Sequence, residues 1–191
     1  MARKSREEAQ LTYESITQAS FDLGAAEGLE NLSIARIADQ LGLSKSGVAG
    51  HFENKTELQL AAVERAIADF VEHVWTANDW REPGLDRLRG VMQSWLRYSR
   101  SRHDYGGCFL TAASIEFDDR PGPVRDRLVE AWRNWMSWLA NDARAGGLNG
   151  ARTVFKLHAI VTEAMWMNQL FDDDRGWALA AESVDEILEA A

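Results

Sequence analysis

Apolar residues recur at every third or fourth position along almost the whole chain, and no convincing stretch alternates between apolar and polar residues as a half-buried strand does. The chain has only three prolines, which leaves room for long helices. These two features predict an all-α fold. Breaks rich in glycine, proline and aspartate divide the chain into about nine helices.

The strongest break, at residues 78–84 (NDWREPG), predicts a boundary between two domains. We expect a three-helix domain over residues 1–55, a connecting helix over 54–77 and a larger helical domain over 78–191. All eight tryptophans lie at or after Trp75, which indicates an aromatic second domain. The helices expected in this domain cover about residues 85–102, a short stretch ending at 116, 124–145, 153–171 and a last stretch ending at 188.

The chain is acidic, with 30 aspartates and glutamates against 21 lysines and arginines and a net charge of −9. A general nucleic-acid coat protein carries a broad basic field, so this class is excluded and any binding to nucleic acid must be local. The first ten residues, MARKSREEAQ, have no apolar core that could serve as a secretory signal, and no later stretch approaches a membrane span. We therefore expect a cytoplasmic protein with no membrane partner.

Two short helices with clear start and stop signals follow the first helix. Ser33 is placed to cap the earlier one, which Gly42 ends, and Ser44 is placed to cap a second helix over about 45–50. Two helices separated by a three-residue turn form a helix-turn-helix pattern. Asn54 then starts the connecting helix with a capping-box-like sequence.

The segment over residues 28–60, GLENLSIARIADQLGLSKSGVAGHFENKTELQL, resembles the TetR family of transcriptional regulators. A second segment, 106–125 (GGCFLTAASIEFDDRPGPVR), is similar to a ligand-domain type found in one branch of that family. The resemblance implies a repressor that binds a palindromic DNA operator as a homodimer. A small hydrophobic or aromatic ligand is expected to release the repressor from the operator. The matching positions are Gly28, Ser33, Ile37, Ala38, Gly42, Ser44, His51, Phe52, Lys55 and Leu58.

The second helix of a helix-turn-helix places its N-terminal residues in the major groove, and Lys45 is the best candidate for a guanine contact. Exposed amides at helix starts attract phosphate. His51 and Lys55 resemble the positions at which the family contacts the DNA backbone. The expected DNA-binding residues are Ser33, Ser44, Lys45, Ser46, Gly47, His51 and Lys55. Phe52 is expected to pack the small core.

Ala49 departs from the family pattern, which commonly has at this position a tyrosine whose hydroxyl reaches a phosphate. The first 65 residues also hold more acidic than basic side chains. Binding is therefore expected to depend on the geometry of a dimer and on helix-end amides more than on a basic field. A basic arm from Arg3, Lys4 and Arg6 can add to it.

The second domain is expected to hold an apolar ligand pocket with a few polar groups. Plain core packing remains an open alternative for each of the aromatic residues. The expected pocket residues are Trp95, Tyr98, Phe109, Phe117, Trp135 and Trp166, with His158 and Thr162 as polar groups.

The helix over residues 153–171 is apolar nearly all round, as expected of a helix that lies between a core and a subunit interface. The resemblance implies that this helix and the helix over 124–145 form a four-helix bundle with their symmetry mates. His158, Thr162, Met165 and Gln169 follow one side of the first of these helices, where they either orient a ligand or face the dimer axis. The expected interface residues are Trp132, Phe155, Ala159 and Met165.

Other classes of function have little support in the sequence. An enzyme would have to use Cys108, the single cysteine, with His103 or His158, and nothing in the sequence brings these residues together. We therefore expect no catalysis, while a redox sensor at Cys108 and a helical-bundle interaction protein without DNA binding remain alternatives. The four histidines show no metal-ligand spacing, so we expect no metal and no cofactor.

Overall fold

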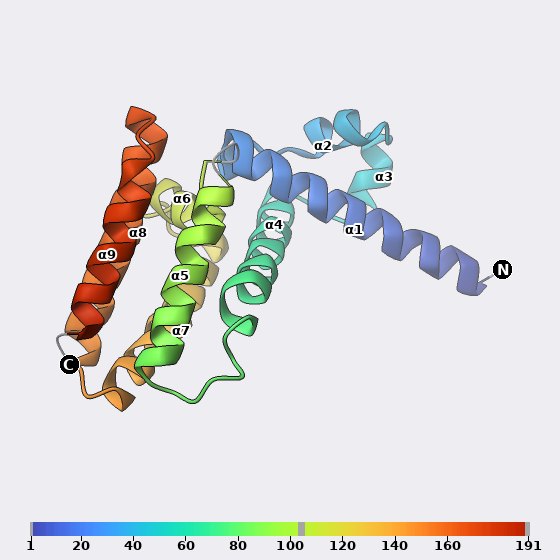
Figure 1. Ribbon diagram of the computed structural model, residues 1–191. Helices are drawn as coiled ribbons and strands as arrows, with labels where there is room; N and C mark the ends of the chain where they lie inside the picture. The colour runs from blue at the N-terminus through green and yellow to red at the C-terminus, as the bar shows by residue number, and fades with distance from the viewer. Residues whose placement is uncertain (1, 103–105, 190–191) are drawn as a thin grey trace.

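The computed structural model describes residues 2–102 and 106–189, with side chains from residue 6 onward. Within these ranges the chain forms nine α-helices, a 3₁₀ turn and a π-helical segment, and no strand, so the expected all-α fold is confirmed (Figure 1). The elements are α1 (Ala2–Glu27), η1 (Leu29–Asn31), α2 (Ile34–Leu41), α3 (Lys45–Ala49), α4 (Lys55–Phe70), η2 (Val71–Thr76), α5 (Leu85–Ser101), α6 (Phe109–Glu116), α7 (Pro123–Ala145), α8 (Gly150–Phe171) and α9 (Arg175–Glu189).

The helix bounds follow the expected ones closely, with one difference at the start of α8. This helix begins at Gly150 rather than near Thr153. Asn149 caps it, because its side-chain oxygen accepts a hydrogen bond from the backbone amide of Arg152 at 3.0 Å. The expected connecting helix is α4 continued by η2, where the chain turns in the wider π-helical form.

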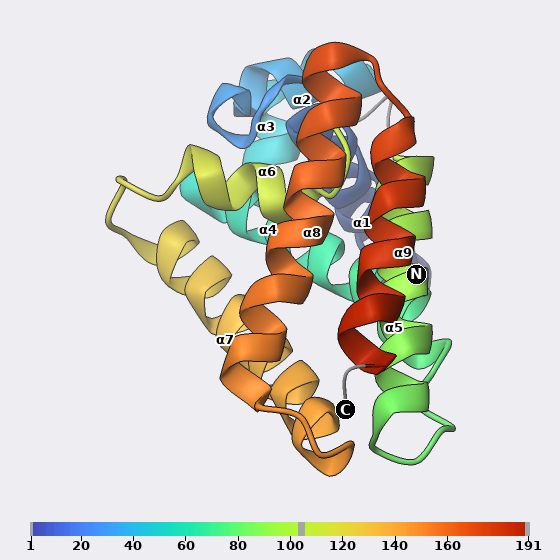
Figure 2. The same ribbon diagram turned by 60° about the vertical axis from the view of Figure 1, so that its left-hand side comes forward.

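The helices form two groups joined by α4 (Figure 1). In the first group α2 and α3 lie beside α1, whose N-terminal half projects away from the rest of the molecule. In the second group α5, α7, α8 and α9 pack side by side. The short helix α6 lies between the groups and contacts α1, η1, α4 and α7, as Figure 2 shows from another side. This arrangement places α6 where a change in one group can reach the other.

The centre of the second group is an aromatic cluster around Phe70 of α4. The Phe70 ring meets the rings of Trp95, Tyr98 and Trp135 edge to face, at centroid distances of 6.0, 5.6 and 4.9 Å. Trp95 is fully buried. Because edge-to-face pairs add stability beyond the area they bury, this cluster fixes α4 against α5 and α7.

Buried carboxylates in this core are paired with arginines. The Asp142 side chain is 0% exposed and accepts two hydrogen bonds from Arg87, which joins α7 to α5. The Asp69 carboxylate accepts hydrogen bonds from the Tyr98 hydroxyl and from Arg102. A buried charge is costly unless it is paired in this way, so these contacts are structural.

None of the described helices is long and apolar enough to cross a membrane. Among the residues with described placement, no group of three or more histidine, cysteine, aspartate or glutamate side chains is arranged to hold a metal ion.

Candidate nucleic-acid interface and ligand site

The helix-turn-helix is capped as the sequence predicts. The Ser33 hydroxyl accepts a hydrogen bond from the amide of Arg36 at 3.2 Å, and the Ser44 hydroxyl accepts one from the amide of Gly47 at 3.0 Å. Gly42 ends α2 with a left-handed φ of 65°, a conformation that glycine adopts without strain. Asn54 caps α4 through the amide of Glu57 at 3.1 Å. The three expected capping sites are thus confirmed.

The expected major-groove residues lie on the solvent side of α3. Lys45, Ser46 and Gly47 are exposed, whereas Val48 of the same helix is fully buried. Lys45 forms no ion pair with any residue whose side chain the structure describes. Its ammonium group is therefore free to meet a base or a phosphate.

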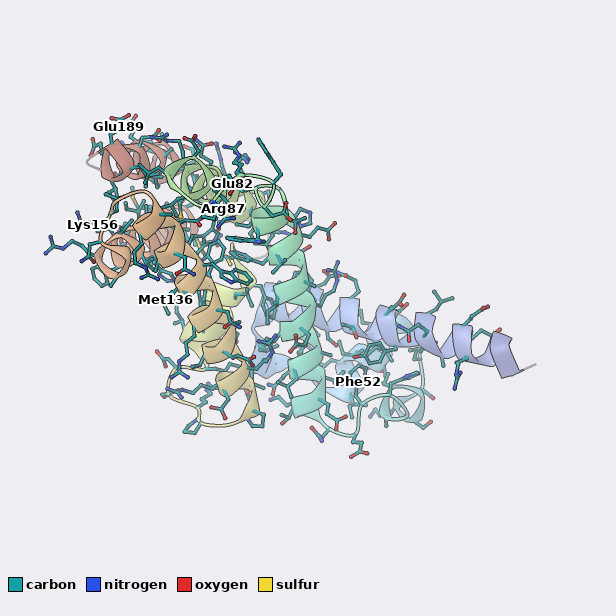
Figure 3. All side chains as sticks on the ribbon, turned by 90° about the horizontal axis from the view of Figure 1, so that it is seen from below. Phe52, Glu82, Arg87, Met136, Lys156 and Glu189 are labelled. Carbon is teal, nitrogen blue, oxygen red and sulfur yellow. The ribbon has the colours of Figure 1, made fainter. Side chains whose placement is uncertain are left out.

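Tyr13 of α1 supports the end of the helix-turn-helix, a role that was not predicted from the sequence. Its ring stacks on Phe52 at a centroid distance of 5.1 Å and lies 6.4 Å from the His51 ring. Phe52 is buried as expected, next to α1 and the first turns of α4 (Figure 3). The signal available in the sequence was spacing, because Tyr13 lies three residues before the buried Ile16 on the same helix.

The cations near α2 and α4 are paired with carboxylates of the same domain. Lys55 donates a hydrogen bond to Glu30 at 2.6 Å, and Arg36 donates one to Glu27 at 2.6 Å. The hydrogen bond from Lys55 lowers the pKa of Glu30. Ala49 is exposed at the end of α3, where it offers no hydroxyl. The surface around α3 therefore carries little unpaired positive charge.

Some of the basic arm expected at the N-terminus lies outside the described side chains. Arg3 and Lys4 belong to this part, while the described Arg6 is exposed on the projecting half of α1. His103, expected as a possible partner of Cys108, also lies outside the described residues.

The expected pocket residues are not brought together into one cavity. Trp95, Tyr98 and Phe109 are buried in the core, where Phe109 packs its ring against Phe21 of α1 at 5.3 Å. Trp166 lies apart from them on the outside of α8, half exposed, with its ring edge-to-face on Phe171. Helical periodicity places all these residues on apolar faces without saying which neighbour covers each face.

Several hollows lie beside α7 instead, and one of them, of about 280 Å³, is lined in part by the expected Phe117. A small cavity of about 90 Å³ between α4, η2 and α7 is lined by residues that include Phe70, Trp75 and Trp135. An open groove of about 1010 Å³ lies between α6, α7 and α8, and we call it the α6–α8 groove. Its lining includes Ser114, Ile115, Trp132, Met136, His158 and Thr162. Of the small cavity and the groove, only the groove has the size of a small-molecule site.

His158 is a partly buried polar group of the α6–α8 groove, whose lining also includes Asp118, Arg133 and Glu163. Its ring lies edge-to-face on Trp132 and Trp95, at 4.9 and 5.4 Å, and its Nδ1 lies 3.4 Å from the Thr162 hydroxyl. Burial lowers the pKa of His158, so the imidazole is neutral at pH 7 and can both donate and accept a hydrogen bond. His158 and Thr162 thus lie together, as the sequence predicts.

The residues expected at a dimer interface divide between the groove, the surface and the core. Phe155 and Ala159 line the groove and are exposed, with Phe155 76% exposed. Trp132 is partly buried in the groove wall. Met165 is only 6% exposed and packs near Gly107, so within a single chain it is a core residue.

The cysteine does not have the surroundings of a reactive nucleophile. Cys108 is 1% exposed, and burial raises the pKa of its thiol. A protonated, buried thiol is neither a nucleophile nor an efficient redox sensor.

A capped, exposed helix-turn-helix joined by one helix to an all-α second domain defines a class of protein, the DNA-binding transcriptional regulators. The pattern of "Bacterial regulatory proteins, tetR family" matches residues 16–62, and that of "Tetracyclin repressor-like, C-terminal domain" matches residues 84–184. The second match alone covers more than half of the chain. The protein therefore belongs to the TetR family, and the expected resemblance is confirmed.

Individual relatives agree with this assignment. An HTH-type transcriptional regulator from Staphylococcus aureus (strain USA300) is 34% identical over 71 residues, so the match spans 37% of this chain and 37% of the relative's length. A TetR transcriptional regulator from Chloroflexus aurantiacus is 20% identical and covers 96% of both chains, with a TM-score of 0.87. AibR, solved in complex with isovaleryl coenzyme A and operator DNA, is 19% identical over 92% of this chain and 97% of its own, with a TM-score of 0.72. The two solved structures show that the fold is shared over nearly the whole chain.

Proposed function

We propose that the protein is a homodimeric repressor that binds a palindromic operator and leaves it when a small hydrophobic or aromatic molecule binds the second domain. In this proposal residues 1–55 bind DNA, 54–77 connect, and 78–191 bind the ligand and form the dimer. The protein acts in the cytoplasm and performs no catalysis. The observation that carries the proposal is the capped helix-turn-helix with Lys45, Ser46 and Gly47 exposed at the start of α3.

The proposed DNA contacts combine one base contact with several phosphate contacts. Lys45 reaches a guanine edge in the major groove, with Ser46 and Gly47 beside it. The exposed helix starts at Ser33 and Ser44 bring backbone amides to phosphates. His51 and Lys55 contact the backbone at the start of α4, and Lys55 exchanges Glu30 for a phosphate when it does so.

The proposed dimer uses the outer face of α8, with α7 beside it. Phe155, Ala159, Trp166 and Leu170 follow one another at helical spacing and are all exposed. A run of exposed apolar side chains along one helix marks an interaction surface, and a two-fold axis along α8 would bury it against its own copy. The two recognition helices then read half-sites one helical turn, or a multiple of it, apart.

The proposed effector site is the α6–α8 groove, which shares Phe155 and Ala159 with the proposed dimer face, so a molecule bound there would lie close to the partner subunit. The walls of the groove are mostly apolar, and His158 and Thr162 supply polar groups that can orient a bound molecule. AibR, which shares the fold, was solved in complex with isovaleryl coenzyme A and operator DNA, and this supports a ligand-responsive regulator.

Selection of bound sequences from a random DNA pool tests the proposal. We expect a palindrome to be enriched, and its affinity for the protein to fall as salt rises, because phosphate contacts release counterions. Lys45→Ala should weaken binding roughly tenfold or more by losing a base contact, whereas Arg100→Ala, an exposed cation of α5, should leave it unchanged. Enrichment of no sequence, or equal affinities of the two variants, would contradict the proposal.

A further inference from the structure

The α6 helix lies between the groove and the DNA-binding helices. At its start, Phe109 packs so closely on α1 that a Cβ added to Gly24 would lie 3.2 Å from its ring. At its end, Glu116 reaches η1, the turn that leads from α1 into α2. On its other side, Ser114 and Ile115 line the α6–α8 groove. The short helix α6 thus lines the proposed effector site on one side and contacts η1 on the other (Figure 2).

The Glu116 carboxylate binds the first amides of η1. Its Oε2 accepts a hydrogen bond from the amide of Leu29 at 2.8 Å, and its Oε1 accepts one from the amide of Glu30 at 2.7 Å. Gly28, which has a φ of +92°, lies against the Glu116 carboxylate, since a Cβ added to Gly28 would be 3.3 Å from Oε1. A carboxylate that binds two backbone amides makes a strong, charge-assisted contact. We call this pair of hydrogen bonds the Glu116–η1 contact.

The Glu116–η1 contact acts on a segment that positions α2. Only Leu32 separates η1 from Ser33, the cap of α2. The carbonyl of Leu29 also accepts a hydrogen bond from Gln59 of α4 at 3.1 Å. A shift of η1 therefore moves the start of α2 relative to α4, and with it the angle at which the helix-turn-helix meets DNA.

On the side away from η1, α6 is linked to the α6–α8 groove through Trp132. The indole Nε1 of Trp132 donates a hydrogen bond to the Ser114 hydroxyl at 2.6 Å, and its ring lies 4.9 Å from His158. Ser114 precedes Glu116 by two residues on the same helix. A molecule that packs against His158 also contacts the Trp132 ring, which lines the same groove, and a shift of that ring would act on α6 through the hydrogen bond to Ser114.

We propose that Glu116 is a positioning residue, which holds η1 in the orientation that binds the operator and through which the state of the α6–α8 groove reaches the helix-turn-helix. The proposal rests on the groove being the effector site. It adds the specific contact by which occupancy of that groove changes operator affinity.

Amide hydrogen exchange at residues 29 and 30 tests the contact itself. We compare Glu116→Gln and Glu116→Ala with Glu186→Gln, which removes the same charge from an exposed position of α9. Because two charge-assisted hydrogen bonds are lost, exchange should become about tenfold faster in Glu116→Ala, and less so in Glu116→Gln, which keeps one acceptor oxygen. Equal exchange in all variants overturns the proposal.

Operator affinity, measured in variants that keep the fold, distinguishes a positioning role of Glu116 from a merely structural one. Circular dichroism should show the same helix content for Glu116→Gln and Glu186→Gln at the temperature of the binding measurement, although weakening of the Glu116–η1 contact lowers the melting temperature of Glu116→Gln. The operator selected with the wild-type protein should nevertheless bind several-fold more weakly to Glu116→Gln and about tenfold more weakly to Glu116→Ala. Unchanged affinity together with faster exchange would show that the contact does not position the helix-turn-helix, and would overturn the proposal.

The link between the α6–α8 groove and the Glu116–η1 contact can be tested with variants of the groove wall, so the ligand need not be known. Trp132→Phe keeps a ring against His158 but removes the donor to Ser114, so exchange at residues 29 and 30 should increase. Trp138→Phe is the matched control on the same helix, because Trp138 stacks on Trp75 outside the groove, at 4.8 Å. Equal exchange in the two variants overturns the link. Since exchange needs no DNA, failure to find an operator would count against the proposed function alone.

Discussion

Glu30 is a single residue at which the DNA-facing surface meets the second domain. Its carboxylate accepts a hydrogen bond from Lys55 at 2.6 Å and lies 3.3 Å from a guanidinium nitrogen of Arg120, which follows α6. Lys55 must leave this carboxylate before it can bind a phosphate. If Lys55 contacts the operator backbone as proposed, Glu30 competes with DNA for it, although an exposed ion pair of this kind is weak.

Replacing Glu30 by Gln should raise operator affinity, by about twofold to fivefold, since an exposed ion pair contributes at most about 1 kcal/mol. The Glu116–η1 contact uses the backbone amide of residue 30 and is retained. Glu53→Gln removes an equal charge from an exposed position just before α4, and it controls for the general change in charge. Fluorescence anisotropy with labelled operator measures both variants. An equal effect of the two would show that Lys55 is not the group released.

His158 shows how burial of one ring makes stability depend on pH. Burial lowers its pKa below the ordinary value of 6.5, so the folded state holds the imidazole neutral. Well above pH 6.5 neither state binds the proton, so the histidine does not change how the free energy of unfolding depends on pH. As the pH falls below 6.5, the unfolded chain binds the proton first, and the free energy of unfolding decreases.

His158→Phe should remove this part of the acid sensitivity. Urea unfolding at pH 7.5 and at pH 5.5 gives the free energy of unfolding of both proteins, and the loss on acidification should be smaller in the variant. The other titrating groups are the same in both proteins and cancel in the comparison. An equal loss in both would contradict the assignment of a lowered pKa to this histidine.

At the scale of single elements, α3 is unusual because it is five residues long and contains or adjoins two glycines. Gly47 lies inside it and Gly50 follows it, in a right-handed helical conformation with φ of −70°. Glycine in such a conformation costs stability, because the unfolded chain loses more freedom there. The recognition helix therefore depends on Val48 and Phe52, both buried, for its stability.

Gly50→Ala should stabilise the protein by up to about 1 kcal/mol, since a Cβ there meets only backbone oxygens at 3.4 and 3.5 Å. Gly42→Ala provides the opposite control, because its left-handed φ of 65° strains any residue with a Cβ. Thermal unfolding should show a higher melting temperature for the first variant and a lower one for the second. Destabilisation by Gly50→Ala would mean that this turn needs a glycine for a reason other than backbone freedom.

For the whole molecule, the exposed face of α8 decides whether one chain can act alone. Phe155, Trp166 and Leu170 are 76, 50 and 61% exposed along this face. In the proposed dimer each helix-turn-helix reads one half of the palindrome, so we expect the affinity for the full operator to depend on dimerisation.

Phe155→Glu should convert the proposed dimer into a monomer, because a charge buried in an apolar interface is left without a partner. Trp80→Glu is the matched control, since Trp80 is 74% exposed in the connection between η2 and α5. Light scattering should give half the mass for Phe155→Glu alone, and its affinity for the palindrome should approach that for a single half-site. A dimeric Phe155→Glu protein would place the interface elsewhere.

The helix-turn-helix could be predicted because its signals are local. Ser33, Ser44 and Asn54 each bond to an amide three residues ahead, and Gly42 sets its own backbone angle. Such contacts involve residues that are neighbours in any helix, so the order of amino acids is enough to find them. The same reasoning located the bounds of most helices.

The contacts between distant parts of the chain could not be predicted in this way. Glu116 bonds to amides that lie 86 and 87 residues earlier, and nothing in the local sequence of either segment indicates the other. Trp95 and Trp166 are equally apolar and equally placed on helices, yet one is fully buried and the other is half exposed. Periodicity tells which face of a helix is apolar and leaves open what covers it.

The sequence by itself thus determined the helices, their caps, the helix-turn-helix and the family, because these follow from residues a few positions apart. The tertiary structure alone decided which aromatic residues form the core, that His158 and Thr162 share a groove with Phe155 and Ala159, and that α6 connects this groove to η1. The physical reason is that burial and pairing depend on which helices pack together, and packing joins residues that the chain keeps far apart.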